Sequence, residues 1–175
     1  DTARPLRTRF ENTIIKSRGR LRYKEAQAIL DKHTTIPHPE GDRQITDYPP
    51  EVISLLHDMD ATSRMIHKRR QAAGQLVLNL PEIDLVLDEE GKVVGAVPED
   101  ESYTHTLIEM FMVEANEAVA RLLDTLDVPF LRRAHAEPAP ESQERMRAFL
   151  NVAGYKLPKT IDRHALQALL KSVKE

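Results

Sequence analysis

The sequence contains no cysteine and no tryptophan, and aromatic residues make up only 5% of its 175 residues. Without cysteine, disulfides and thiolate zinc sites are excluded, and the composition fits a cytoplasmic protein. No apolar run approaches the roughly 20 residues of a membrane-spanning helix, and no signal-peptide pattern opens the chain. We therefore expect a cytoplasmic, helix-rich protein with an aliphatic core, no membrane partner and enough chain for one domain.

The sequence also lacks the short motifs that carry complete active sites. It has no glycine-rich phosphate loop, HExxH pair, nucleophile elbow or aspartate-rich cation cluster. His33 and His38 have no carboxylate partners at the spacing of a known metal site, so no metal centre is predicted. By motifs alone the chain is a soluble α+β domain.

Charge is distributed unevenly, although the net charge is only −3. Residues 1–24 hold eight lysines and arginines against two acids, whereas residues 81–117 hold eleven acids against one lysine. A basic end can attract a polyanion, while an acidic middle repels one or helps to bind cations. The chain is therefore not a simple basic nucleic-acid binder.

Hydrophobic periodicity and turn residues predict an α+β fold in which helices dominate. The expected elements are a strand over 10–22, a helix over 23–30, a loop over 33–49, a helix over 49–73, a hairpin of 83–87 with 93–97, a helix over 105–126, a short strand over 128–135, a helix over 141–153 and a last helix introduced by Asp162. The loop has three prolines and a glycine without periodicity, so it is expected to be flexible. Gly74 is expected as a left-handed helix end and Gly91 at the hairpin turn.

Cations occupy every second position at the end of the predicted N-terminal strand, at Lys16, Arg18, Arg20 and Arg22. In a strand they would share one face. The charge of such a row is complementary to that of a phosphate backbone, although the spacing of the cations matches the spacing of the phosphates poorly. It is equally typical of a solvated edge strand that charges protect from aggregation.

The helix over 105–126 carries a broad apolar stripe with Glu109 and Asn116 along one edge. The residues expected to face inward are Leu107, Ile108, Phe111, Met112, Ala115, Ala118, Val119, Leu122, Leu123 and Leu126. A carboxylate and an amide on a rigid element, where the core meets solvent, suit a functional site. Thr106 and Glu109 also have capping-box spacing, in which Glu109 would only close the first turn. A solvated helix edge is a third interpretation.

Four stretches, in order and at compatible spacing, resemble one known family. They are FENTIIKSRGRLRYKEAQAIL, RRQAAGQLVLNLPEIDLVLDEEGKVVGAV, HTLIEMFMVEANEAVAR and PFLRRAHAEPAPE. They are similar to the "S-x-A-x-L-x-Y", "RR…G-A-L…PE…F-x-LDE-x-G", "H-x-LIEE-x-M-x-x-AN-x-x-AA" and "P-x-LYR-x-H-x-x-P" segments of the catalytic (RNB) domain of the ribonuclease II/ribonuclease R family. Each motif is weak alone, but the ordered set is specific and spans residues 9–174.

The resemblance implies processive 3′→5′ hydrolysis of single-stranded RNA to nucleoside monophosphates, with Mg²⁺ held by an aspartate cluster. Tyr23, by pattern alone a half-buried ring with a solvated hydroxyl, matches the family tyrosine near the 3′-terminal nucleotide. Glu109 matches the glutamate that contacts the terminal ribose, and a carboxylate there can accept the 2′-hydroxyl proton. RNA-binding roles are also expected for Asn116, Arg18, Arg20 and Leu78, and support of the site for His105, Arg133 and His135.

Three departures limit the resemblance. Leu78 stands where the family often has an aromatic residue that clamps stacked bases, and Met110 replaces the second glutamate of "LIEE". The aspartate cluster and a Ser-Pro-Ile-Arg-Arg-Tyr-like motif of the family lie outside the matched region. We therefore expect a central part of an RNB domain, inactive by itself, whose partners are single-stranded RNA and the rest of the parent enzyme. An RNA-binding or scaffold protein that has lost catalysis, and a purely structural helical adaptor, are the alternatives.

Overall fold

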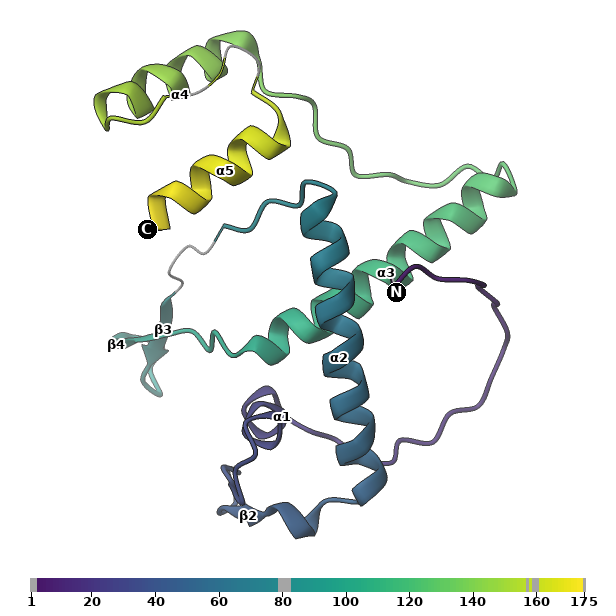
Figure 1. Ribbon diagram of the computed structural model, residues 1–175. Helices are drawn as coiled ribbons and strands as arrows, with labels where there is room; N and C mark the ends of the chain where they lie inside the picture. Colours follow the sequence, from purple (N-terminus) through teal and green to yellow (C-terminus); the bar gives the residue numbers. More distant parts are fainter. Residues whose placement is uncertain (1–2, 79–82, 157, 159–160, 175) are drawn as a thin grey trace. The chain divides into compact units, whose positions relative to one another are not determined.

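The computed structural model describes residues 3–78, 83–156, 158 and 161–174, and its elements are drawn in Figure 1. In chain order they are α1 (Tyr23–Leu30), β1 (Thr35–Ile36), β2 (Arg43–Gln44), a 3₁₀ helix (Ile45–Asp47), α2 (Pro50–Ala72), β3 (Ile83–Leu87), β4 (Val93–Pro98), α3 (Tyr103–Thr125), α4 (Pro140–Val152) and α5 (Arg163–Lys174). Within this part of the chain the fold is α+β, with five α-helices and two antiparallel strand pairs. The predicted fold class is confirmed.

The chain divides into two compact units. The first combines Asp1–Arg69 with Pro81–Leu126, and the second combines Arg70–Leu80 with Asp127–Glu175. No helix in the described ranges has the length and apolar character that a membrane crossing requires.

The hydrophobic core lies in the first unit, where α1 packs against β1 and against α3. Its buried members are Ala26, Ala28, Ile29, Ile36, Tyr48, Leu56 and Leu107. Two further contacts join α2 to α3: Arg69 pairs with Glu114, and the Tyr103 hydroxyl donates to the Ser63 hydroxyl at 3.3 Å. The N-terminal end of α3 is thereby held between α1 and α2.

Residues 3–22 form no strand, so the predicted strand over 10–22 is wrong. Ile14 and Ile15 are fully or almost fully exposed. A strand exists only when a neighbouring strand accepts its hydrogen bonds, and the described residues provide no such neighbour here. The predicted strand over 128–135 is wrong for the same reason, and Leu131 within it is fully exposed.

The segment over 33–49 is more ordered than the predicted loop. Thr35 pairs with Gln44 and Ile36 with Arg43 in a short antiparallel ladder, and the 3₁₀ helix follows. Ile36 and Tyr48 are both buried in the core. Two apolar anchors therefore fix this proline-containing segment, and a composition-based prediction of a loop could not reveal them.

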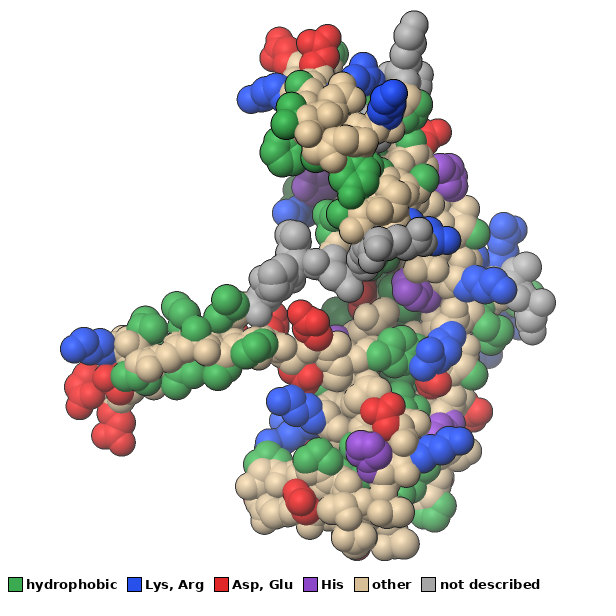
Figure 2. All heavy atoms as spheres, turned by 60° about the vertical axis from the view of Figure 1, so that its left-hand side comes forward, with side chains coloured by type: hydrophobic (Ala, Val, Ile, Leu, Met, Phe, Trp, Pro, Cys, Tyr) green, Lys and Arg blue, Asp and Glu red, His purple; other side chains and the backbone are tan. Residues whose placement is uncertain are grey.

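The hairpin of β3 and β4 pairs with register Ile83↔Pro98 through Leu87↔Val93, with an irregularity between Val86 and Leu87. Its side chains are largely exposed, and Figure 2 shows hydrophobic side chains along both sides of the hairpin and charged ones at its turn. The hairpin and α2 end near their predicted boundaries. Gly74 has φ +90°, a left-handed conformation that glycine adopts without strain, so its predicted role at the helix end is confirmed.

Candidate functional site

Tyr23, the first residue of α1, is tied to the first turn of α3 by hydrogen bonds. The Thr104 hydroxyl donates to the Tyr23 carbonyl at 2.9 Å, and the Thr104 N–H donates to the side-chain oxygen of Gln27 at 3.2 Å. Thr104 itself is buried. The N-terminal ends of the two helices are therefore joined, which brings Tyr23 beside residues 81 positions later in the chain.

The ring of Tyr23 stacks on the imidazole of His105, with centroids 3.7 Å apart and an interplanar angle of 20°. The Nε2 atom of His105 lies 3.4 Å from the Asp100 Oδ2 atom. Tyr23 is still 42% exposed although His105 covers one face of its ring. A partly exposed aromatic ring that is held against a second ring suits stacking of a nucleotide base or sugar.

Glu109 follows His105 by one helical turn, so the two side chains lie on the same face of α3. The helix begins at Tyr103 with Ser102 as N-cap. Glu109 is therefore in the second turn, and the capping-box interpretation is wrong. Its side chain is exposed, and within the described residues its carboxylate forms no hydrogen bond or ion pair. The carboxylate is free to accept a hydrogen bond from a ligand.

Asn116 lies two turns beyond Glu109 on the same face and is exposed. Met112 lies between them and is 59% exposed, so its predicted inward orientation is wrong. We call His105, Glu109, Met112 and Asn116 the α3 stripe. The packed face of α3 runs instead through Thr104, Leu107 and Met110 at a spacing of three, and Met110, where the sequence departs from the family, is completely buried.

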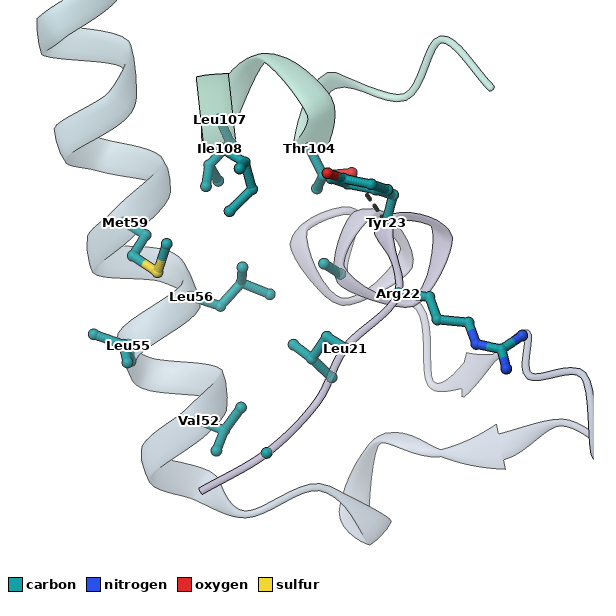
Figure 3. A pocket seen from close by; sticks show the side chains of 12 residues that line it. Leu21, Arg22, Tyr23, Val52, Leu55, Leu56, Met59, Thr104, Leu107 and Ile108 are labelled. Atoms are coloured by element: carbon teal, nitrogen blue, oxygen red, sulfur yellow. Dashed lines mark hydrogen bonds between the residues drawn. The ribbon is translucent and has the colours of Figure 1, made fainter. Parts of the chain in front are cut away.

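A pocket of about 270 Å³ has Tyr23 in its lining. Figure 3 shows Leu21 to Tyr23 on one wall, Val52 to Met59 of α2 on another, and Thr104 to Ile108 of α3 on the third. A Cβ at Gly19 would lie 3.2 Å from a Val52 methyl carbon, so glycine allows the segment before Tyr23 to approach α2 closely. The lining is mainly apolar, which indicates a packing role.

A second pocket, of about 360 Å³, also has Tyr23 in its lining. The titratable residues that line it besides Tyr23 are Arg22, Lys24, Glu25, His38, Asp42 and Asp100. Both pockets belong to the first unit, and Tyr23 contributes to the lining of each.

Glu25 is a buried carboxylate that the sequence did not single out. Its Oε1 accepts the Tyr48 hydroxyl at 2.7 Å, and its Oε2 accepts the Arg22 N–H at 2.8 Å. Burial acts to raise the pKa of Glu25, but the Arg22 and Tyr48 hydrogen bonds outweigh it and the pKa is lowered. Burial and the Glu25 carboxylate together raise the pKa of Tyr48 to about 12. In the sequence, the Arg22-x-x-Glu25 spacing could have indicated this residue, because it places Glu25 at the third position of α1, where a glutamate can accept the N-cap N–H.

The remaining predicted residues are not gathered around Tyr23 by any described contact. Arg18 pairs with Glu51 at 3.3 Å in an exposed ion pair, which contributes little to stability. Arg20 is exposed, and because residues 3–22 are not a strand, the predicted common face of cations is absent from the structure. Leu78, Arg133 and His135 are exposed and belong to the second unit. The structure thus stacks Tyr23 on His105, and helix geometry places Glu109 one turn beyond His105.

The described ranges contain no group of three or more histidines and acids that could hold a metal ion. The donor set present does not fit a two-metal centre, which requires several carboxylates converging on adjacent ions.

Sequence comparison identifies the class of protein. The RNB domain family matches residues 1–175, and the chain belongs to this family. It is 31% identical over 145 residues to Ribonuclease R of Aquifex aeolicus, covering 83% of this chain and 19% of that protein. It is 30% identical over 165 residues to Ribonuclease R of Thermotoga maritima, covering 93% of this chain and 22% of that protein.

Among solved structures, the chain resembles the apo form of Mycoplasma genitalium RNase R with a TM-score of 0.74 and 21% identity. The match covers 87% of this chain and 23% of that one, and it shows a shared fold. The chain spans about a fifth of the length of the curated relatives it matches. The predicted family membership is confirmed.

Proposed function

We propose that this chain is part of a 3′→5′ exoribonuclease that hydrolyses single-stranded RNA to nucleoside monophosphates with Mg²⁺. The ribonuclease R relatives support the reaction class. The observation that carries the proposal for this chain is the Tyr23–His105 stack one helical turn from the free carboxylate of Glu109. An aromatic platform beside a hydrogen-bond acceptor is suited to the sugar and base at an RNA end.

In this proposal Tyr23 stacks on the 3′-terminal nucleotide and Glu109 accepts a hydrogen bond from its ribose 2′-hydroxyl. A carboxylate is an acceptor only, so it recognises a hydroxyl donor that deoxyribose lacks. Asn116 extends the polar part of the α3 stripe along the strand, and Arg18 and Arg20 attract the phosphate backbone. The Mg²⁺ ions would be held by residues of a longer protein, and the chain alone would be inactive.

The test compares Glu109→Gln with Glu117→Gln in the full-length protein. Glu117 is a matched control because it lies on the same helix and pairs with Arg121. For each variant, nucleotide release is measured on an RNA oligonucleotide and on the same oligonucleotide with a 2′-deoxy 3′ terminus. Glu109→Gln should weaken the preference for the ribose end by about 10- to 100-fold, the size of one hydrogen bond to a charged group.

Glu117→Gln should leave the preference unchanged. A Glu109→Gln protein with normal preference but a much lower melting temperature would show that the glutamate is structural. Binding of RNA without any Mg²⁺-dependent nucleotide release by the full-length wild-type protein would favour the alternative of an RNA-binding protein without catalysis. Absence of salt-sensitive RNA binding would point to a structural adaptor.

A further inference from the structure

Asp100 lies just before α3 and uses its two carboxylate oxygens for different partners. Its Oδ1 accepts the Ser102 N–H at 3.2 Å, which fixes the carboxylate relative to the backbone that enters the helix. Its Oδ2 lies 3.4 Å from Nε2 of His105, longer than an ordinary hydrogen bond, so the contact is chiefly electrostatic. Asp100 and Tyr23 also line the same pocket, of about 360 Å³.

The charge on Asp100 is consistent with this contact. Burial acts to raise its pKa, but the Ser102 N–H and the His105 ring outweigh burial, and the Lys24 ammonium adds to them, so the pKa of Asp100 is lowered. The carboxylate is therefore ionised at neutral pH. An ionised carboxylate favours an N–H on the nearer ring nitrogen of His105.

The plane of the imidazole in turn determines how the Tyr23 ring is supported. The two rings are nearly parallel at 3.7 Å, so a rotation of the His105 ring would remove the flat surface on which Tyr23 rests. The Thr104 hydrogen bond acts on the backbone of Tyr23 and does not fix the orientation of its ring. Within the described residues, the contact that orients the phenol ring from that side is therefore His105, and the group that orients His105 is Asp100.

We propose that Asp100 is a positioning residue, which acts through His105 to hold the Tyr23 ring in the orientation where its accessible face receives the terminal nucleotide. The inference rests on the proposed function, because it requires Tyr23 to contact RNA. It adds a residue outside the four stretches that carry the family resemblance, and it assigns His105 a defined part in the site.

The first test is a double-mutant cycle in the full-length protein, with KM and kcat measured on a single-stranded RNA oligonucleotide. Asp100→Ala should raise KM by about three- to tenfold, the size of one aromatic stacking contact, with a smaller effect on kcat. Asp100→Asn, which keeps an oxygen acceptor, should recover part of the loss. In a His105→Phe background, Asp100→Ala should have no further effect, because its partner is gone. Glu101→Ala, the neighbouring exposed carboxylate, is the matched control.

The second test uses NMR to measure the environment of the His105 ring in the absence of RNA. Histidine is labelled with ¹³C at Cε1, and the His105 signal is identified by its loss in His105→Phe. Asp100→Ala should move this signal, because it removes the carboxylate that lies 3.4 Å from the ring. Tyr23→Leu should move it by removing the ring current, whereas Glu101→Ala should leave it unchanged.

The two tests separate the possible failures. If the wild-type protein neither binds nor degrades RNA, the proposed function and this inference are both overturned. If the wild-type protein is active, the inference alone is overturned by additive KM effects of Asp100→Ala and His105→Phe, or by a His105 signal that Asp100→Ala does not move.

Discussion

Glu25 shows how single residues hold the region around Tyr23. The carboxylate is 2% exposed, yet both of its oxygens accept hydrogen bonds, from the Tyr48 hydroxyl and the Arg22 N–H. Tyr48 lies at the end of the segment over 33–49, next to Pro49. Arg22 is the N-cap of α1, and Glu25 is the third residue of that helix. The Glu25 carboxylate therefore connects the start of α1 to the segment over 33–49, which sequence composition alone predicts to be a loop. Glu25 lies two residues after Tyr23 in the chain.

We predict that Tyr48→Phe lowers the free energy of unfolding by about 1–3 kcal/mol at pH 7, because it leaves a buried carboxylate oxygen without a donor. The pKa of Tyr48 is raised from 10.0 to about 12. A group whose pKa is raised on folding stabilises the folded state at pH values below its unfolded pKa. This stabilisation is lost as pH rises from 10 through about 12. The wild-type protein should therefore lose this contribution across that range, and the variant should lack it. Urea denaturation at several pH values measures both effects.

At acidic pH the change in stability has the opposite dependence on pH. The pKa of Glu25 is lowered from 4.5, so its contribution is present above pH 4.5 and is lost as pH falls through the folded value. Because the Tyr48 hydroxyl is one cause of the lowered pKa, the variant should lose less on acidification than the wild type. Tyr155→Phe, in the second unit, is the control. Equal pH profiles for Tyr48→Phe and the wild type would contradict the assignment.

At the scale of elements, the hairpin and α3 differ in whether a leucine side chain is exposed or buried. Leu85 of β3 is 62% exposed, whereas Leu107 of α3 is 1% exposed. The hairpin pairs only with itself among the described residues. A two-stranded hairpin alone is at best marginally stable in water. Its stability therefore contributes little to that of the chain, whereas α3 is part of the core.

We predict that Leu107→Ala lowers the free energy of unfolding by about 2–5 kcal/mol, because it removes buried methyl groups from the core. The same substitution at Leu85 should change it by less than about 0.5 kcal/mol, as is usual for surface positions. Denaturant melts of the two variants compare one chemical change in two elements. A Leu85→Ala effect as large as that of Leu107→Ala would show that the hairpin is covered in solution.

At the scale of the whole molecule, burial is concentrated in one unit. The buried hydrophobic residues of the described chain are Ala26, Ala28, Ile29, Ile36, Tyr48, Leu56, Ile66, Leu107 and Met110, and all belong to the first unit. In the second unit Phe149 and Val152 of α4 and Val173 of α5 are exposed. Helices gain most of their stability from packing an apolar face. The two units should therefore differ in local stability.

We predict that native-state hydrogen exchange of this 175-residue chain separates the units. The amides of α4 and α5 should exchange through local opening with free energies close to zero, whereas those of α1 and the first half of α3 should approach the global free energy of unfolding. Mass spectrometry of peptides from each helix measures the difference. Uniform protection across α1, α3, α4 and α5 would show that the second unit is stabilised by packing as extensive as that of the first.

Much of the element order was predictable because it depends on local pattern. The helix expected over 49–73 is observed as Pro50–Ala72, the helix expected over 105–126 as Tyr103–Thr125, and the hairpin within a residue of its predicted ends. Strands were less predictable, since a run of β-branched residues such as Ile14 and Ile15 forms a strand only if another strand pairs with it. The buried face of α3 also could not be read from hydrophobicity alone, because Met110 and Met112 are chemically identical and only packing distinguishes them.

The sequence by itself determined the helical segments, the hairpin, the family and the residue types available for binding an RNA end, because periodicity, turn residues and ordered motifs are properties of the chain as written. Only the tertiary structure decided which residues meet. Tyr23 and His105 are far apart along the chain, and the Thr104 hydrogen bond between two helix starts makes them neighbours. Contact across such a separation depends on how elements pack, which local pattern does not specify.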